Sequence, residues 1–101
     1  MCNTFISGAT GKVGRILVEK VLEDSDLILS GGSASKGSKS IGKDLGVFIG
    51  KPDINISVVD DISNQKDIDL IIDFSRPENS IKVLRFANKE KIPMVIGTTG
   101  F

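Results

Sequence analysis

Short apolar runs alternate with longer amphipathic segments along this chain, and the two kinds of segment follow one another regularly. Asn3–Ser7 is expected to form a short buried strand. Leu70–Ile72 is an uninterrupted apolar run, which is typical of a parallel strand buried on both faces. Leu27–Leu29, Ile54–Val59 and Ile92–Ile96 supply three more expected strands. The pattern therefore predicts five strands separated by helices or loops.

Two segments carry apolar residues at helical spacing. The first predicted helix runs from Lys12 to Glu23, and its apolar positions are Val13, Ile16, Leu17, Val21 and Leu22. The second runs from Pro77 to Lys89, with Ile81, Leu84 and Ala87 expected on the core side. Ser75 and Glu78 have the spacing of a capping box at its start, and Pro77 suits the first turn.

Two connections lack a periodic pattern. Gly31–Gly50 is rich in glycine and serine, and we expect a long surface loop with a helical turn near Gly42–Leu45. Asp60–Asp67 is expected to be a polar connection with one or two helical turns at most. Because the remaining strands alternate with crossovers, the chain is predicted to be an α/β protein, with a Rossmann-like doubly wound, mostly parallel sheet.

In such a sheet a ligand binds at the carboxyl ends of the strands. Three turns follow predicted strands and should converge at that edge: Gly8–Gly14, Phe74–Pro77 and Gly97–Phe101. The first has glycine at every third position, a G-x-x-G-x-x-G spacing related to the common dinucleotide fingerprint. A helix that begins at such a turn directs free N–H groups and its positive dipole end at a phosphate. A plain strand-to-helix turn is the alternative interpretation.

Composition narrows the class of protein. The 101 residues suffice for one domain, 1–101, and the formal net charge of zero gives no reason to expect a nucleic acid or a membrane surface as partner. No apolar run approaches the roughly 20 residues that span a bilayer, and the start does not resemble a signal peptide. Cys2 is the single cysteine, which fits a reducing, cytoplasmic location. The sequence has no histidine, the commonest general acid or base.

The region about 20 positions past the glycines bears on cofactor choice, because an acidic residue there binds the adenosine ribose of NAD. That position falls within Ser33–Lys36, where no acid is present, and the nearest downstream acid is Asp44. Serines and a lysine would accept a 2′-phosphate, so NADP(H) is favoured and NAD(H) remains open. A solvated loop with no cofactor contact is the alternative.

Three segments together resemble a known family. Gly8–Gly14 after the first strand, Ile72–Glu78 after the fourth and Val95–Phe101 after the fifth are similar to 4-hydroxy-tetrahydrodipicolinate reductase, also called dihydrodipicolinate reductase. The resemblance spans the whole chain but covers only the amino-terminal cofactor domain of that family. The last two motifs, in this order, are the more specific ones.

The resemblance implies cofactor contacts along the length of a dinucleotide. The residues that would bind the pyrophosphate are Gly8, Ala9, Thr10, Gly11, Lys12 and Val13. Those near the nicotinamide would be Gly97, Thr98 and Thr99, with Thr99 also facing the substrate, and Phe74 and Arg76 would flank the cofactor. Ser35 and Lys36 would lie near the adenosine ribose, where the family often has an acidic and a basic residue. The serine departs from that pattern.

The resemblance also implies a reaction. In the family, hydride passes from the nicotinamide to a cyclic unsaturated dicarboxylate on the route to diaminopimelate and lysine. The proton donor is a histidine, supported by a lysine, in a second domain that also builds a homotetramer. Neither that domain nor its histidine is in this sequence. We therefore expect no catalytic residue here, and a chain that binds cofactor without turning over substrate.

Other interpretations remain open at this point. Gly-Ala-Thr-Gly also opens aspartate-semialdehyde dehydrogenase and extended short-chain dehydrogenases, although the latter need a tyrosine and this sequence has none. A non-catalytic cofactor-sensing module is a third possibility. The acidic residues Asp60, Asp61, Asp67 and Asp69 are expected to form a solvated edge rather than a metal site. Asp73 is expected to cap the turn after its strand.

Overall fold

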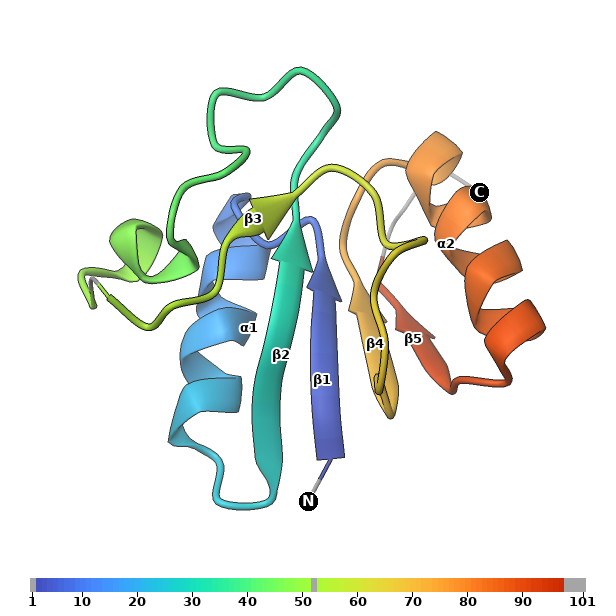
Figure 1. The fold of residues 1–101 in the computed structure, drawn as a ribbon, viewed down its shortest axis with the longest axis horizontal. Coiled ribbons are helices and arrows are strands. Elements are labelled where there is room, and N and C mark those ends of the chain that lie inside the picture. The colour runs from blue at the N-terminus through green and yellow to red at the C-terminus, as the bar shows by residue number, and fades with distance from the viewer. Residues whose placement is uncertain (1, 52, 98–101) are drawn as a thin grey trace.

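The structure is a computed structural model that describes residues 2–51 and 53–97. Its centre is a sheet of five parallel strands in the order β3-β2-β1-β4-β5 (Figure 1). The strands are β1 (Cys2–Ser7), β2 (Leu27–Ser33), β3 (Val58–Val59), β4 (Leu70–Asp73) and β5 (Met94–Ile96). Strand order of this kind is that of a dinucleotide-binding fold. The predicted Rossmann-like α/β class is confirmed.

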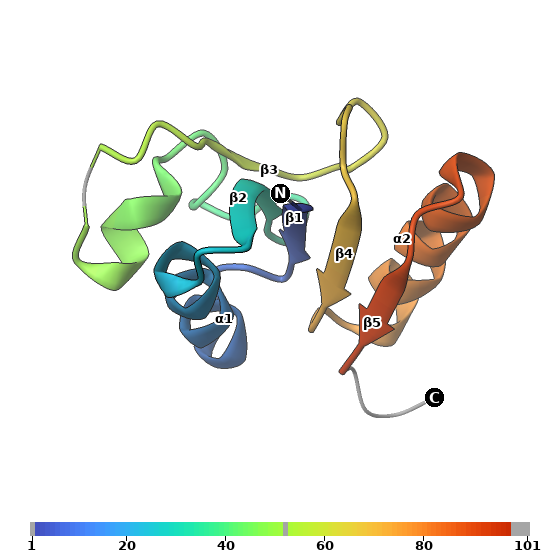
Figure 2. The ribbon, with the colours of Figure 1, turned by 90° about the horizontal axis from the view of Figure 1, so that it is seen from below.

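Helices cover both faces of the sheet. Figure 2 shows α1 (Lys12–Glu23) and α2 (Pro77–Glu90) on opposite sides of the strands. A short 3₁₀ helix, η1 (Leu45–Ile49), lies on the same side as α1. Each face has its own apolar core. One is Ile6, Ala9, Val18, Val21, Leu29, Leu45 and Val58, and the other is Phe5, Ile62, Ile68, Ile71, Val83 and Ala87.

The central strand β1 is the point at which strand order reverses. Ser7, its last residue, is paired with Ser33 of β2 on one side and with Asp73 of β4 on the other. The chain continues from β1 to the β2 side and returns later to the β4 side, and the loops leaving β1 and β4 lead to helices on opposite faces of the sheet. In doubly wound sheets the crevice outside this reversal is where ligands bind.

The glycine pair Gly31-Gly32 is part of β2 rather than the start of a loop, which corrects the prediction for Gly31–Gly50. A Cβ at Gly31 would lie 2.8 Å from the Phe5 ring, and a Cβ at Gly32 would lie 2.8 Å from the Ala9 Cβ. Both glycines are therefore explained by close packing inside the sheet. Composition alone does not distinguish this use of glycine from a turn.

Asp44 explains two further departures from the predicted elements. Its carboxylate accepts hydrogen bonds from the backbone N–H groups of Gly46, Ile54 and Ile56. The helical turn expected at Gly42–Leu45 is consequently displaced to η1, which Asp44 caps. Ile54 and Ile56 bond to this side chain instead of a strand, so only Val58–Val59 of the expected third strand pairs in the sheet.

The boundary between α2 and β5 also differs from the prediction. Ile92 was expected in the last strand, but its N–H donates to the Ala87 carbonyl and closes the end of α2. Lys91 adopts the left-handed conformation that often ends a helix, at φ +57°. The strand begins only after Pro93, which has no N–H to contribute.

The buried face of each helix is rotated from the one that periodicity indicated. In α2, Ala87 is buried as expected, whereas Ile81 and Leu84 are exposed and Ser80 and Val83 are buried instead. Ser80 is held under the helix by the carboxylate of Asp73. In α1 the exposed residues among those expected in the core are Val13, Ile16 and Leu22. Within the part of the chain that the structure describes, no helix is long and apolar enough to cross a membrane.

Candidate functional site

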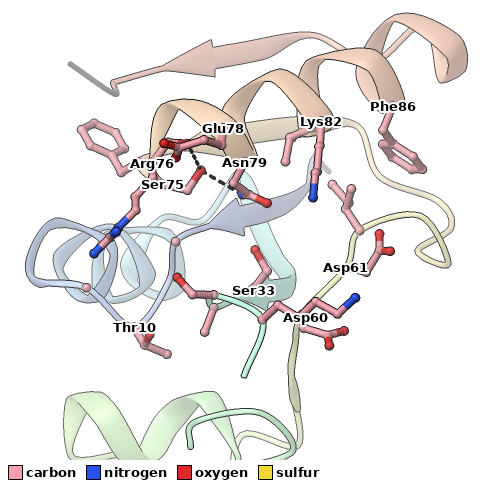
Figure 3. Close-up of a pocket in the computed structure, with 18 of the residues that line it drawn as sticks. Thr10, Ser33, Asp60, Asp61, Ser75, Arg76, Glu78, Asn79, Lys82 and Phe86 are labelled. Atoms are coloured by element: carbon pink, nitrogen blue, oxygen red, sulfur yellow. Dashed lines mark hydrogen bonds between the residues drawn. The ribbon is translucent and has the colours of Figure 1, made fainter. Parts of the chain in front are cut away.

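A cavity of about 850 Å³ opens at the carboxyl ends of the strands, where the loops after β1, β2, β3 and β4 meet (Figure 3). Pockets of this size accommodate a ligand as large as a cofactor. Its lining from the first three loops is Gly8, Thr10, Gly11, Ser33, Ala34, Ser35, Lys36, Asp60, Asp61, Ile62 and Ser63. The β4–α2 side contributes Phe74, Ser75, Arg76, Glu78, Asn79, Lys82, Val83 and Phe86.

The three glycines of the first turn have different roles. Gly8 has φ +82°, and a Cβ there would lie 2.9 Å from the Phe74 backbone. A Cβ at Gly14 would lie 2.0 Å from the Gly8 carbonyl oxygen, so only glycine allows α1 to pack against the turn. The nearest atom to a Cβ at Gly11 is 3.7 Å away. Gly8 and Gly14 are therefore required by the fold, whereas Gly11 leaves open space on the cavity side.

Some backbone N–H groups of this turn hold the fold together, and others lie at the start of α1. The N–H groups of Gly8 and Ala9 both donate to the Ser33 carbonyl, at 3.1 and 2.8 Å, and so connect the turn to the end of β2. The helix α1 begins directly afterwards. Its N-cap is Gly11, which has no side chain, and its first turn contains no acidic residue. The first N–H groups of a helix have no partner within the helix, and they carry a partial positive charge.

Arg15 braces the same turn from α1. Its Nε donates to the Thr10 carbonyl at 2.9 Å, and its guanidinium lies 5.4 Å from the centre of the Phe48 ring. The contact with Phe48 connects the turn to η1. A cation above an aromatic face is attracted by the ring, so the side chain is restrained at both ends.

Hydrogen bonds to a buried carboxylate shape the β4–α2 loop. Asp73, at the end of β4, is fully buried and accepts from the hydroxyls of Ser75 and Ser80. It also accepts from the Ser75 N–H at 3.3 Å, so the predicted capping of the turn by Asp73 is confirmed. The predicted capping box is wrong, because the N-cap of α2 is Arg76 and the Ser75 side chain is directed to Asp73 instead.

Gly97, directly after β5, packs against Phe74 of the β4–α2 loop. The Gly97 N–H donates to the Asp73 carbonyl at 2.8 Å. A Cβ at Gly97 would lie 2.1 Å from Cζ of Phe74. The absence of a side chain at Gly97 therefore leaves the room that the Phe74 ring occupies on the cavity wall.

The far end of the cavity has exposed charged groups of both signs. Asp60 and Asp61 follow β3, and Lys82 extends from α2 toward them (Figure 3). Lys36, after β2, lines the same cavity. The backbone N–H and the hydroxyl of Ser63 hold the pKa of Asp61 below its ordinary value of 3.8, and the charges of Lys36 and Lys82 lower it further. Asp61 is thus a stable anion at this end of the cavity at neutral pH.

Residues 2–101 match the protein family described as "Dihydrodipicolinate reductase, N-terminus". The chain belongs to this family.

Proteins named 4-hydroxy-tetrahydrodipicolinate reductase are among its relatives. Those of Burkholderia multivorans and Burkholderia vietnamiensis are each 43% identical to it over 97 residues, and that of Burkholderia ambifaria is 42% identical. Each alignment covers 95% of this chain and 36% of the relative. The chain therefore spans about a third of the length of these reductases, and it corresponds to their amino-terminal part.

Most site residues predicted for this reductase family lie together at the cavity. Those that line it are Gly8, Thr10, Gly11, Ser35, Lys36, Phe74 and Arg76. Ala9 is fully buried beneath the turn, and Lys12 and Val13 are exposed on α1 outside the lining. Gly97 reaches the site through its contact with Phe74. Thr98 and Thr99 lie outside the described residues, so their roles stay predictions.

The sequence reasoning missed one face of α2. The cavity residues Asn79, Lys82, Val83 and Phe86 have the spacing of a single helical face, i, i+3, i+4 and i+7. That spacing was readable, but the apolar positions Ile81 and Leu84 indicated another orientation for the helix. Asp60 and Asp61 directly follow β3, so the rule for strand ends would have placed them at the site.

The residues present fit a dinucleotide. The turn offers a surface without side chains at Gly11, no side chain caps the start of α1, and the cavity continues to the ends of β2 and β3. Three cationic side chains, Lys36, Arg76 and Lys82, line the cavity. Within residues 2–51 and 53–97 no group of three His, Cys, Asp or Glu side chains is placed to hold a metal ion.

Proposed function

We propose that this chain is the cofactor-binding half of an NAD(P)H-dependent 4-hydroxy-tetrahydrodipicolinate reductase. The whole enzyme would pass hydride from the nicotinamide to a cyclic unsaturated dicarboxylate, on the route to diaminopimelate and lysine. This chain would provide the cofactor-binding site, and a second domain would provide the substrate site and the proton donor. The observation that carries the proposal is the family match over residues 2–101, together with a cavity at the strand ends where that family's motifs meet.

The proposed arrangement runs along the cavity. The pyrophosphate lies at Gly11 and the start of α1, because the helix dipole and free amides there favour negative charge. Arg76, on the opposite wall, is available to the same phosphates. The adenosine ribose lies toward Ser35 and Lys36, and the nicotinamide toward Phe74 and Gly97. Of the predicted pyrophosphate residues, Gly8 and Ala9 act by holding the turn rather than by donating their amides.

We further propose that NADP(H) is preferred over NAD(H). Ser35 and Lys36 are exposed at the end of β2, in the position from which the adenosine ribose is recognised. Lys82 adds a second cation at this end. Asp60 and Asp61 oppose the preference, because they would repel a 2′-phosphate, so the proposal requires that Lys36 and Lys82 approach that phosphate more closely than the two carboxylates do. Fluorescence titrations of the same sample with NADPH and NADH measure the ratio of the two dissociation constants.

Reductase activity tests the proposed division of labour. We expect the 101-residue chain to bind reduced cofactor and to leave 4-hydroxy-tetrahydrodipicolinate unreduced. Joining it to the carboxyl-terminal domain of a Burkholderia relative should give cofactor oxidation that depends on the substrate. Turnover by the short chain would overturn the division. Binding of neither NADPH nor NADH would overturn the proposed function itself. A cytoplasmic location and a homotetrameric full-length enzyme stay predictions.

A further inference from the structure

Asn79, in the first turn of α2, connects two loops that line the cavity. Its Nδ2 donates to Oγ of Ser7 at 3.1 Å and to Oγ of Ser75 at 2.9 Å. Ser7 is the fully buried last residue of β1 and directly precedes the glycine turn. Ser75 belongs to the β4–α2 loop. One side chain therefore bridges Ser7 and Ser75, which are 68 positions apart in the sequence.

The direction of each hydrogen bond in this group follows from the carboxylate of Asp73. A carboxylate only accepts, so the Ser75 hydroxyl donates its one hydrogen to Asp73, at 2.5 Å. The oxygen of Ser75 can then only accept from Asn79. The amide of Asn79 must consequently turn its NH₂ group toward the two serines. Of the Asn79 side-chain amide, the carbonyl oxygen is then left to face the cavity, which Asn79 lines (Figure 3).

The two loops that Asn79 connects also touch directly. The Phe74 N–H donates to the Ser7 carbonyl at 3.0 Å, and the Gly8 Cα faces the Phe74 backbone so closely that a Cβ would lie 2.9 Å from it. A shift of the β4–α2 loop would therefore displace the glycine turn. Asn79 limits this shift, because its amide adds a side-chain hydrogen bond to each of the two loops.

We propose that Asn79 is a positioning residue of the cofactor site. Its amide fixes the spacing between the glycine turn and the β4–α2 loop, and it presents an oriented acceptor to a hydroxyl or amide donor on the nicotinamide half of the cofactor. The inference rests on the proposed function, because it assumes that a dinucleotide occupies the cavity. It adds a residue that the family motifs in the loops do not include.

The test uses Asn79→Ala in the 101-residue chain with three probes: NADPH, reduced nicotinamide mononucleotide and 2′,5′-ADP. The variant should bind NADPH and the mononucleotide about tenfold more weakly, which corresponds to the loss of roughly one hydrogen bond to an oriented partner. Its affinity for 2′,5′-ADP should stay within about twofold, because Ser35 and Lys36 are untouched. Asn88→Ala is the matched control, since Asn88 is an exposed asparagine of the same helix.

A merely structural role would weaken all three probes equally, and that result would overturn the inference. Unchanged NADPH binding by a folded Asn79→Ala chain would also overturn it. If the wild-type chain binds none of the probes, the proposed function fails together with the inference. If the wild-type chain binds NADPH and the Asn79→Ala variant binds it equally well, only the inference about Asn79 fails, and the proposed function stands.

Ser7→Ala provides a second test that does not depend on the stability of Asn79→Ala. Removing the Ser7 hydroxyl should reproduce part of the loss of NADPH affinity. The double variant should then bind no more weakly than Asn79→Ala alone, because both changes remove the same contact. Losses that add up would show that the two residues act separately and would contradict the proposal.

Discussion

The two ends of the cavity are built in different ways. The glycine-side wall, formed by Gly8–Gly14 and Asp73–Arg76, is held by backbone contacts and by a buried carboxylate with its serine partners. The adenosine-side wall, formed by Ser33–Lys36 and Asp60–Ser63, presents exposed charged side chains. The first wall fixes geometry, and the second offers charge. Substitutions in the first should therefore affect folding and binding together, whereas those in the second should affect selectivity alone.

The largest effect on the glycine-side wall is expected from Gly14→Ala. The new Cβ would overlap the Gly8 carbonyl oxygen, and neither backbone segment can move without disturbing β1 or α1. We expect the free energy of unfolding to fall by about 3 kcal/mol or more and NADPH binding to be lost. Denaturant titration measures the first quantity. Gly11→Ala is the control, because its Cβ has room: stability should change by less than about 1 kcal/mol.

Asp73→Ala should have the next largest effect. The change leaves the hydroxyls of Ser75 and Ser80 without their buried acceptor and removes the side chain that holds Ser80 under α2. We expect a loss of about 2–3 kcal/mol in the free energy of unfolding. The measurement is urea denaturation followed by circular dichroism. A loss below about 0.5 kcal/mol would mean that the carboxylate does not hold this wall.

Gly97→Ala should have a moderate effect on the same wall. The added methyl would occupy the place of the Phe74 ring, but a side chain can rotate away where backbone cannot. We therefore expect a loss of about 1–2 kcal/mol in stability and a clear loss of NADPH affinity, as Phe74 turns toward the cavity. Phe74→Ala combined with Gly97→Ala should be less destabilising than the sum of the single changes, because it removes the overlap.

The stability that the Asp44 carboxylate contributes, in the segment beside the adenosine-side wall, should depend on pH. Desolvation raises its pKa, but the backbone N–H groups of Ile56, Ile54 and Gly46 lower it more, so the pKa lies below the ordinary 3.8. A lowered pKa contributes stability above the unfolded-state value and loses it as pH falls through the folded-state value. The stability advantage of wild type over Asp44→Asn should thus be constant near neutral pH and shrink below about pH 4. An advantage that grows on acidification would contradict this assignment.

The smallest effect on stability is expected from Lys36→Ala on the adenosine-side wall. Lys36 is exposed, so the free energy of unfolding should change by less than about 0.5 kcal/mol. NADPH affinity should fall about fivefold while NADH affinity stays nearly constant, because only the 2′-phosphate loses a partner. Lys39→Ala, a nearby lysine outside the cavity lining, is the control. Equal losses of affinity for NADPH and NADH would show that Lys36 does not discriminate between the two cofactors.

Local pattern predicted the parts of this molecule that depend on local chemistry. The first helix begins and ends at the predicted residues, because the glycine turn precedes it and a polar Asp24 follows. The predicted site residues in the loops after β1, β2 and β4 meet because parallel strands end at one edge. Asp73 was also assigned correctly to the turn beside it.

The features that were not predicted correctly depend on packing between residues far apart in the sequence. Gly31 and Gly32 resemble a turn in sequence, and only the neighbouring Phe5 ring and Ala9 explain why β2 needs them. Ser75 resembles an N-cap, but a buried carboxylate competes for its hydroxyl. The cavity face of α2 was missed because the burial of Ser80 by Asp73 rotates the helix away from its apolar stripe.

The most direct test follows the backbone amides of ¹⁵N-labelled chain by NMR during titration with NADPH. We expect saturable shifts at Thr10–Val13, at Ser35 and Lys36, and at Ser75–Arg76, with little change at Asp24–Asp26 on the opposite edge of the sheet. Shifts centred on that opposite edge, or no saturable shifts at all, would contradict a dinucleotide site at the start of α1.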